Sequence, residues 1–221
     1  MFTPDLKVQV HPNYGDDATV IDGCSCEFTA GQWKHVEVLV VEALSIQSVH
    51  VSFVGFMTGD YGRLSMQHPV NANGYFSPTS SVDIGATVIP IPVDAASVIG
   101  AGYGVAVEFW ASDDSELKEI RGISSIDGNN LTISEPTAYA YSTSAILRLV
   151  VGCFAPIGGG GPNHITSGFH AVGDGQMVFG SENEATAPVP AGLLLSHRFK
   201  ATSEVSTRKI AISYRFRRAS S

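Results

Sequence analysis

The cysteine and histidine side chains are the most obvious candidates for metal binding in this sequence. Cys24 and Cys26 are separated by one residue and Cys153 is distant, so three thiols are present where a closed zinc site needs four ligands. The seven histidines are dispersed, and no two of them stand four residues apart around a Glu, the spacing of a helical zinc site. They are His11, His35, His50, His68, His164, His170 and His197. We therefore predict no metal and no cofactor, with a weak metal or glycan contact beside His164 and His170 as the alternative.

Residue types that serve catalysis are also present, but without the spacing that catalysis requires. The run Gly158–Gly161 is not followed by Lys and then Ser or Thr, so a flexible loop is a better interpretation than a phosphate cradle. The Gly-x-Ser-x-Gly turn of serine hydrolases is absent. Asp113, Asp114 and Glu116 are suited to calcium, yet an acidic turn is more typically just solvated. The sequence predicts that the protein is not an enzyme, although carboxylates paired only in space leave no mark in a sequence.

The composition favours a β protein with many turns. The 221 residues, of 23.3 kDa, are enough for one large β domain or two smaller ones. The 23 Gly and 11 Pro are scattered along the chain, which favours turns over long helices. Only 15% of residues are charged against 44% hydrophobic, a balance that a partner-covered surface would explain. The odd number of cysteines favours reduced thiols over a disulfide framework.

The charge is acidic and unevenly placed. A formal charge of −8 and a pI near 5.2 argue against nucleic-acid reading or attachment to an anionic membrane, which rest on cationic side chains. Basic residues crowd the end of the chain, at Arg198, Lys200, Arg208, Lys209, Arg215, Arg217 and Arg218. Acidic residues lie earlier, at Asp16, Asp17, Asp22, Glu27, Asp113, Asp114, Glu116 and Glu119. One hypothesis is that the basic region of one copy of the protein contacts the acidic region of another. The alternative is that these charges lie at strand ends and are simply solvated.

We expect no export signal at the start of the given sequence. Residues 1–5 read Met-Phe-Thr-Pro-Asp, with neither a basic nor an apolar region. The apolar run Val36–Leu44 is interrupted by Glu37 and Glu42 and is too short to cross a bilayer. We expect a soluble protein made in a cytoplasm and not inserted in a membrane.

Alternating apolar residues predict strands in the first part of the chain. The clearest are residues 6–10, 36–40 and 49–54, and a short helix between the last two is an alternative to extended structure there. Residues 55–81 are rich in Gly, Asn, Ser and Pro and are predicted to form a long loop. Loops of this length often form contact surfaces.

Residues 86–151 hold the most continuous β signals. Pro90 and Pro92 restrict the first extended segment to a sheet edge or a linker. Apolar strands follow at 105–110, 119–126, 131–135 and 145–151, and the turn sequence Asp127–Asn130 joins the middle two. The three-residue spacing of Ile in the second strand predicts a bulge near Gly122.

The last strand, residues 209–217, is the most regular in the sequence. One face carries Ile210, Ile212, Tyr214 and Phe216, and the other carries Lys209, Arg215 and Arg217. Because terminal strands tend to be held by pairing, we predict a mainly β fold in which residues 1–85 and 150–221 form a β-sandwich-like domain. Residues 86–149 are then inserted as a small β-barrel.

The order of features from Ala95 to Leu149 resembles a known module. The order is a Gly-containing turn, a Val-Ala-Val-Glu-Phe-Trp strand, an acidic turn, Glu-Ile-Arg-Gly-Ile-Ser-Ser-Ile, Gly-Asn-Asn-Leu-Thr-Ile, a Pro, a Tyr and an apolar strand. It resembles the small β-barrel module of tailed-bacteriophage virion proteins of the tail, baseplate and head-to-tail joining types. The chain departs from that pattern at Ser142-Thr143-Ser144, where a Pro-Gly or Ala-Gly turn is more typical.

The resemblance implies a structural component of a virion. Such a protein would assemble with copies of itself in a ring or trimer and with neighbouring tail or baseplate proteins, and it would be made in the host cytoplasm. The alternatives are a carbohydrate-binding β-sandwich for host recognition, with a surface glycan as ligand, and a capsid decoration protein. The predicted subunit contacts are aromatic residues taken as exposed and basic residues of the last strand, namely Phe56, Tyr61, Tyr75, Phe76, Arg215, Arg217 and Arg218.

Overall fold

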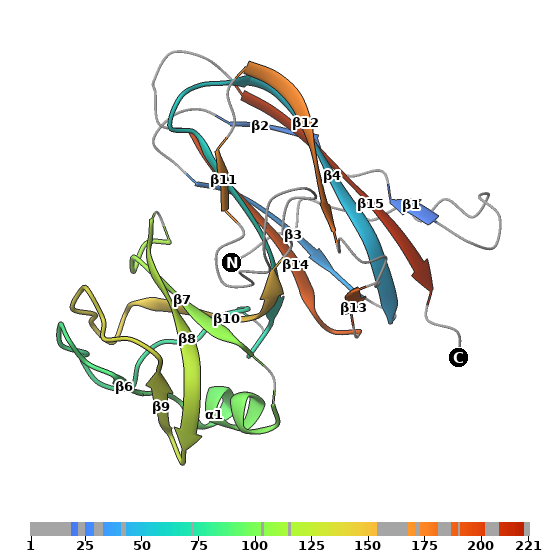
Figure 1. The fold of residues 1–221 in the computed structure, drawn as a ribbon. Helices are drawn as coiled ribbons and strands as arrows, with labels where there is room; N and C mark the ends of the chain where they lie inside the picture. The colour runs from blue at the N-terminus through green and yellow to red at the C-terminus, as the bar shows by residue number, and fades with distance from the viewer. Residues whose placement is uncertain are drawn as a thin grey trace. The chain divides into compact units, whose positions relative to one another are not determined.

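The computed structural model is mainly β, with one short helix among the residues that it describes. It describes residues 19–21, 25–28, 33–40, 43–71, 73–102, 104–114, 116–153, 168–170, 173–180, 187–189, 191–201 and 208–218. The chain divides into two compact units (Figure 1). Unit 1 comprises Met66–Gly152, and unit 2 comprises the described residues before Met66 and after Gly152. The predicted domain boundaries at 86 and 149 stay a prediction.

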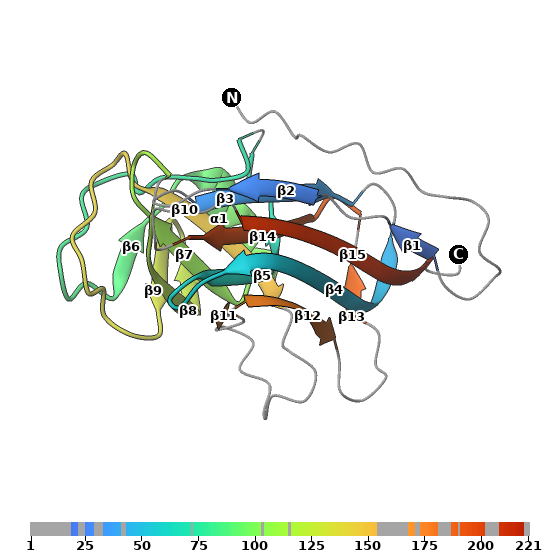
Figure 2. The ribbon, with the colours of Figure 1, turned by 90° about the horizontal axis from the view of Figure 1, so that it is seen from above.

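Unit 2 is a β-sandwich-like unit of two antiparallel sheets, which confirms the predicted fold class. In one sheet the strand order is β1-β15-β4-β12, with β2 beside β15 and β13 beside β4. In the other, the order is β3-β14-β5, with β11 beside β5. Figures 1 and 2 show β15, β4 and β12 running side by side. The strands are β1 (Thr19–Ile21), β2 (Ser25–Phe28), β3 (Trp33–Leu39), β4 (Leu44–Phe56), β5 (Tyr61–His68), β11 (Gly168–His170), β12 (Gly173–Gly180), β13 (Ala187–Val189), β14 (Leu194–Lys200) and β15 (Arg208–Arg218).

The alternation predicted for the last strand is present in β15. Ile210, Ile212 and Tyr214 are buried, whereas Lys209 and Ala211 are exposed. The inward residues pack with those of β4 and β14, because apolar side chains of the two sheets share one core. The core also contains Val49, Val51, Phe53, Leu195 and Phe199.

The structure contradicts one alternative and one prediction for this part of the chain. The short helix considered before residue 49 is not formed, since β4 is extended from Leu44 and pairs with β15 over most of its length. The predicted loop 55–81 contains β5, in which Arg63, Ser65 and Gln67 are buried. Polar residues at inward positions hid the strand, because the sequence pattern marks inward positions only when they are apolar.

Unit 1 is built on an open antiparallel sheet of order β10-β7-β8-β9-β6. The elements are β6 (Val88–Pro90), α1 (Val93–Gly100), β7 (Ala106–Trp110), β8 (Leu117–Asp127), β9 (Asn130–Ile133) and β10 (Ile146–Cys153). The unpredicted helix α1 follows Pro92 and turns Ala95, Ala96 and Ile99 into the core. The core also includes Phe76, Val82, Ile89, Val107, Phe109, Leu131, Ile133, Tyr141, Leu147 and Leu149.

The local turn chemistry predicted for this unit is confirmed. The β8–β9 hairpin turns through Gly128 and Asn129, and Gly128 has the positive φ of 56° that glycine adopts readily. A register shift between Ile123 and Ser125 places a bulge next to Gly122. Strand β6 pairs only with β9 among the described strands, so Pro90 lies in an edge strand.

The described strands of unit 1 do not close into the predicted barrel. Single bridges, Phe76 with Leu147 and Val82 with Tyr141, stand where a continuous strand would be needed for closure. Pro90 and Pro92 have no N–H to donate, which limits β6 to three residues. The unit is therefore an open sheet covered by loops and a helix.

Several predictions lie outside the described residues. They concern the strand at 6–10, the side chains of Cys24 and His164, and the glycine run Gly158–Gly161. Within the described residues, no helix has the length and apolar character needed to cross a membrane.

Candidate functional site

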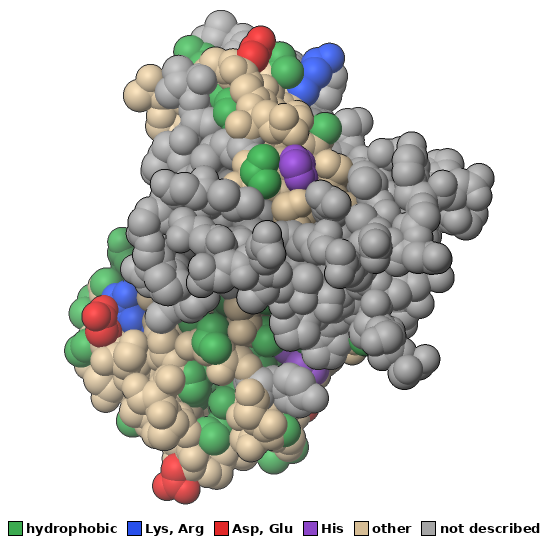
Figure 3. All heavy atoms as spheres, turned by 45° about the vertical axis from the view of Figure 1, so that its right-hand side comes forward, with side chains coloured by type: hydrophobic (Ala, Val, Ile, Leu, Met, Phe, Trp, Pro, Cys, Tyr) green, Lys and Arg blue, Asp and Glu red, His purple; other side chains and the backbone are tan. Residues whose placement is uncertain are grey.

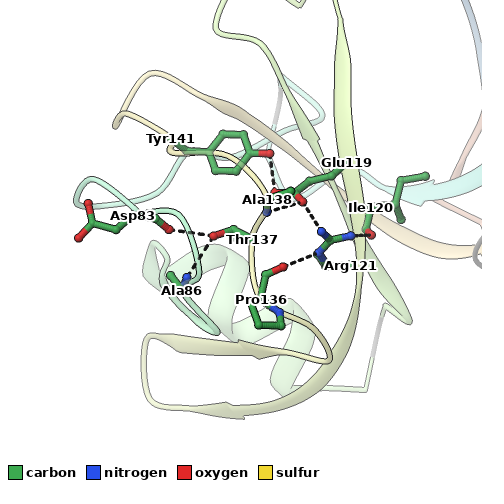
Figure 4. A network of polar contacts seen from close by, with 9 residues as sticks. All are labelled: Asp83, Ala86, Glu119, Ile120, Arg121, Pro136, Thr137, Ala138 and Tyr141. Atoms are coloured by element: carbon green, nitrogen blue, oxygen red, sulfur yellow. Dashed lines mark hydrogen bonds and ion pairs between the residues drawn. The ribbon is translucent and has the colours of Figure 1, made fainter.

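The carboxylate of Glu119 is the centre of a polar network in unit 1 (Figure 4). Glu119 lies in β8 and is 8% exposed. Its Oε1 accepts a hydrogen bond from the phenol O–H of Tyr141 at 2.7 Å, and its Oε2 accepts one from the backbone N–H of Ala138 at 2.9 Å. Arg121 Nη2 forms an ion pair with Oε2 at 2.5 Å. One buried carboxylate thus holds two positions of the chain that returns from β9 toward β10.

The strand pairing places Glu119 for this role. Glu119 lies opposite Phe109 of β7, and the ring of Phe109 packs on that of Tyr141 with centroids 4.8 Å apart. Burial, and then the hydrogen bond to Glu119, raises the pKa of Tyr141 well above its ordinary value. The phenol therefore stays protonated and donates to the carboxylate, which makes the pair a structural brace.

The network continues through Arg121 and Thr137. Arg121 Nε donates to the carbonyl of Pro136 at 3.1 Å. The Thr137 hydroxyl donates to the carbonyl of Asp83 at 2.8 Å and accepts the N–H of Ala86 at 3.2 Å. The loop before β6 and the loop after β9 are thereby fixed to each other and to β8.

An open pocket of about 340 Å³ lies next to this network. Its walls include Ile84, Ser112, Lys118, Tyr139 and Ser142, with the buried Trp110 and Tyr141 also contributing. Tyr139 is 49% exposed and Ile84 is 69% exposed. The Lys118 ammonium lies 5.9 Å from the centre of the Tyr139 ring and 2.5 Å from Glu116, whose hydrogen bond raises the pKa of Lys118. The pocket offers an aromatic face and hydroxyl groups.

A second set of buried polar side chains lies in the same unit. Glu108 Oε2 accepts from Gln67 Nε2 at 3.1 Å and from Trp110 Nε1 at 2.9 Å. Arg148, opposite Glu108 on β10, donates to Asp114 at 2.8 Å. The hydrogen bond from Arg148 to Asp114 ties the acidic turn before β8 to strand β10. The Arg148 side chain is fully buried.

Unit 2 contains a buried ion pair and a buried histidine. Arg208 Nε donates to Asp60 Oδ2 at 2.8 Å, and both side chains are fully buried. The His197 ring lies 5.4 Å from that of Tyr214 in the facing sheet. Among the described residues, neither His197 nitrogen has a hydrogen-bond partner, and burial lowers the pKa of His197 to about 3. The ion pair and the histidine are therefore parts of the buried interior of unit 2.

The predicted contact residues differ in accessibility. Phe56 and Phe76 are each 2% exposed, so the expectation that they are exposed is wrong. Phe56 faces the interior at the end of β4, and Phe76 packs in the core of unit 1. Tyr61 and Tyr75 are half-buried.

The three basic residues predicted to make contacts, Arg215, Arg217 and Arg218, lie in β15. Their side chains are outside the described part of the chain. The predicted contact role of all seven residues stays a prediction. In the part of the chain that the structure describes, no three His, Cys, Asp or Glu residues gather in a way that would hold a metal ion.

Sequence reasoning missed most of the buried charged residues. Glu119 was predicted only as the first residue of the strand 119–126 and as one of the acidic residues, and Asp60 lay in the predicted loop 55–81. Arg208 had a usable signal, since it continues the spacing of Ile210 and Ile212 on the buried face of β15.

Comparison with known proteins gives no family. No protein-family model matches the chain, and no curated protein matches it. Among solved structures, the complex of VP16 and VP17, the two major capsid proteins of bacteriophage P23-77, aligns with 14% identity and a TM-score of 0.19. That alignment covers 91% of this chain and 99% of the other.

Two structures from infectious bursal disease virus are also similar at a low level. The Gt strain aligns with 12% identity and a TM-score of 0.15, over 96% of this chain and 44% of the other. The VP2 subviral particle aligns with 12% identity and a TM-score of 0.16, over 98% and 46%. TM-scores this low show neither a shared fold nor a shared function.

Proposed function

We propose that this protein is a non-enzymatic structural component of a bacteriophage virion, in the tail or baseplate, that assembles through β-rich subunit contacts. The resemblance of residues 95–149 to a module of tailed-phage virion proteins supports the class of protein. Mainly β architecture suits the role, because a rigid β unit presents loops and strands to neighbours in a fixed geometry.

The observation that carries the proposal is the exposure of apolar side chains in one short segment of unit 1. Ile84 is 69% exposed, Val93 is 67% exposed and Val88, in the edge strand β6, is 46% exposed. Single exposed apolar residues are ordinary, but several within one segment favour a surface that a partner covers. Among the described side chains on the face drawn in Figure 3, hydrophobic ones are more frequent than charged ones.

The bracing of unit 1 supports the same role. Glu119, Arg121 and Thr137 engage the loop before β6 and the loop after β9 with side-chain hydrogen bonds and an ion pair. A contact surface fixed before binding loses less conformational entropy when subunits associate.

Two experiments test the place of the protein. Reading frames for tape-measure, portal or baseplate proteins next to its gene are expected. Immunogold labelling of purified particles is expected to mark the tail or baseplate. Labelling of the head surface would instead favour a capsid decoration protein, and absence from the particle would overturn the virion assignment.

The pocket beside Tyr139 favours one second candidate, a carbohydrate-binding protein for host recognition. An exposed aromatic ring next to serine hydroxyls is suited to stacking and hydrogen bonding with a sugar. Binding on a glycan array that Tyr139→Ala abolishes, and that Tyr61→Ala leaves unchanged, would favour this candidate over assembly alone.

A further inference from the structure

The pocket of unit 1 brings exposed aromatic and apolar side chains together in a concave site. Tyr139 and Ile84 both line the pocket and are 49% and 69% exposed, and the buried Tyr141 also contributes to the wall. Single exposed apolar residues are ordinary on a flat surface, but in a concave site they offer a ligand a place out of water. The pocket is therefore a candidate binding site.

The backbone that carries Tyr139 is fixed on both sides by one carboxylate. Ala138, the residue before it, donates its N–H to Glu119 Oε2, and Tyr141, two residues after it, donates its phenol O–H to Glu119 Oε1 (Figure 4). Glu119 itself is 8% exposed and lies in β8, so the anchor belongs to the sheet. The position of the Tyr139 backbone is thus set before any ligand arrives.

The backbone that carries Ile84 is tied to the same segment. Val82 and Tyr141 exchange two backbone hydrogen bonds, each of 2.8 Å. On the other side of Ile84, the Gly85 N–H donates to the carbonyl of Thr137 at 2.8 Å. The two walls of the pocket are held together by these bonds, and a site formed in advance loses less conformational entropy when it binds a ligand.

The polar groups of the pocket carry little net charge. The Lys118 ammonium lies 5.9 Å from the centre of the Tyr139 ring, and its charge is balanced by the ion pair with Glu116. An ammonium group has three N–H donors, so the ion pair leaves it able to donate to a ligand as well. Ser112 and Ser142 are exposed and add hydroxyl groups that donate or accept.

We propose that this pocket binds a neutral pyranose sugar, which stacks on the ring of Tyr139 and receives hydrogen bonds from Lys118 and the serine hydroxyls. The inference rests on the second candidate function and names the class of sugar. One face of a pyranose presents C–H groups, which the negative face of an aromatic ring attracts. The pocket volume of about 340 Å³ lies at the lower end of the roughly 300–1,000 Å³ of ligand pockets, which suits a small ligand.

The balanced charge of Lys118 favours a neutral sugar over an acidic one. A sugar carboxylate that enters the pocket loses hydration, and the nearest cation is already compensated by Glu116. The hydroxyl groups of a neutral sugar lose less, because the lysine and serine groups replace their bonds to water.

The sugar site overlaps the exposed apolar segment of the proposed subunit contact only at Ile84. Val88 and Val93 are not among the residues that line the pocket. Tyr139 and Lys118 lie outside that segment, in the loop after β9 and in β8. Substitutions at these two positions therefore test the sugar site separately from the subunit contact.

The test measures binding of simple sugars to the full chain by saturation-transfer difference NMR. The probes are the methyl pyranosides of glucose, galactose and mannose, and the methyl glycosides of glucuronic and galacturonic acid as matched acidic sugars. The variants are Tyr139→Ala, Tyr139→Phe and Lys118→Met. The control is Val105→Ala, an exposed valine of the same unit that does not line the pocket. Thermal unfolding checks that each variant folds.

At least one neutral pyranoside is expected to bind the wild type, about tenfold or more tightly than its matched acidic sugar. Tyr139→Ala should raise the dissociation constant by about tenfold or more, because the stacking surface is lost, and Tyr139→Phe should restore most of this loss. Lys118→Met should raise the dissociation constant by about three- to tenfold through the loss of hydrogen bonds. Val105→Ala should bind like the wild type.

Four outcomes would overturn the inference. If Tyr139→Ala binds a sugar like the wild type, the sugar site lies elsewhere and the carbohydrate-binding candidate stands. If the acidic sugars bind more tightly than their neutral counterparts, the class of sugar is wrong. If no pyranoside binds, the site is not a sugar site, and the glycan array decides separately whether the protein binds larger carbohydrates. If Tyr139→Ala abolishes self-association and no sugar competes with it, the pocket holds a neighbouring subunit.

Discussion

At the scale of single residues, buried polar groups organise this protein. Glu119 joins strand β8 to the loop between β9 and β10 through its contacts, and Asp60 holds Arg208 in the interior of unit 2. A buried charge is tolerated only when it is paired and hydrogen-bonded, because its loss of hydration is costly. These residues therefore define where loops sit, and substitutions at them should act on stability.

Removing the phenol hydroxyl of Tyr141 tests the brace. Tyr141→Phe deletes the donor to the Glu119 carboxylate and should lower the free energy of unfolding by about 1.5–3 kcal/mol, the range for hydrogen bonds to charged groups. Tyr139→Phe, on a ring that is 49% exposed, should change it by less than about 0.5 kcal/mol. Urea unfolding measures both. Equal effects of the two substitutions would contradict the bracing role.

His197 should make unit 2 sensitive to acid. Burial lowers the pKa of His197 to about 3 from an ordinary 6.5, so between these values the unfolded chain binds a proton that the folded one does not. The contribution of the neutral His197 to the free energy of unfolding is fully present above pH 6.5. It falls by about 1.4 kcal/mol per pH unit as the pH drops toward 3.

The His197→Leu variant isolates this contribution. Unfolding followed at a series of pH values should show a shallower loss of stability in the variant than in the wild type over that window. Tyr214→Phe, which changes the facing ring and keeps the histidine, should retain the wild-type slope. An unchanged slope in His197→Leu would show that other groups cause the acid sensitivity.

At the scale of elements, the approach of β10 to the turn before β7 depends on Gly104. Its φ is +107°, and a Cβ there would overlap Leu149 Cδ1 and lie 3.3 Å from Ile123 Cδ1. Gly85 also has a positive φ, of +83°, but has open space around it. A substitution at Gly85 would strain only the backbone, whereas one at Gly104 would also crowd the core.

Substituting these glycines tests the packing of unit 1. Gly104→Ala should cost about 2–4 kcal/mol, since backbone strain adds to overpacking against a buried leucine. Gly85→Ala should cost only about 1 kcal/mol from the left-handed backbone. Thermal unfolding compares them, and a larger loss for Gly85→Ala would contradict the packing described for β10.

The elements that the sequence predicted well are those with local signals. The turn at Asp127–Asn130, the bulge beside Gly122 and the alternation of β15 follow from glycine, turn residues and period-two patterning. Strand β5 was missed because its inward residues are polar and depend on distant partners such as Glu108 for Gln67. The Glu119 network was missed for the same reason, since Tyr141 reaches it from another element.

At the scale of the whole molecule, the proposed assembly would bury the exposed segment around β6. That segment carries large apolar side chains and the exposed carboxylates of Asp83 and Asp94. Residues 66–152, which include it, contain nine Asp or Glu and three Lys or Arg, a formal charge of −6. A protein that works alone gains nothing from such a surface, whereas an assembling one buries it.

The most direct test is the molar mass of the purified chain by light scattering across a wide concentration range. We predict that mass rises with concentration for the wild type and for Val105→Ser, whose exposed valine lies outside residues 84–93. We also predict that Ile84→Ser with Val93→Ser lowers the mass toward that of a 23.3 kDa monomer at the same concentrations. A wild type that stays monomeric throughout, and does not associate with other virion proteins, would contradict the account.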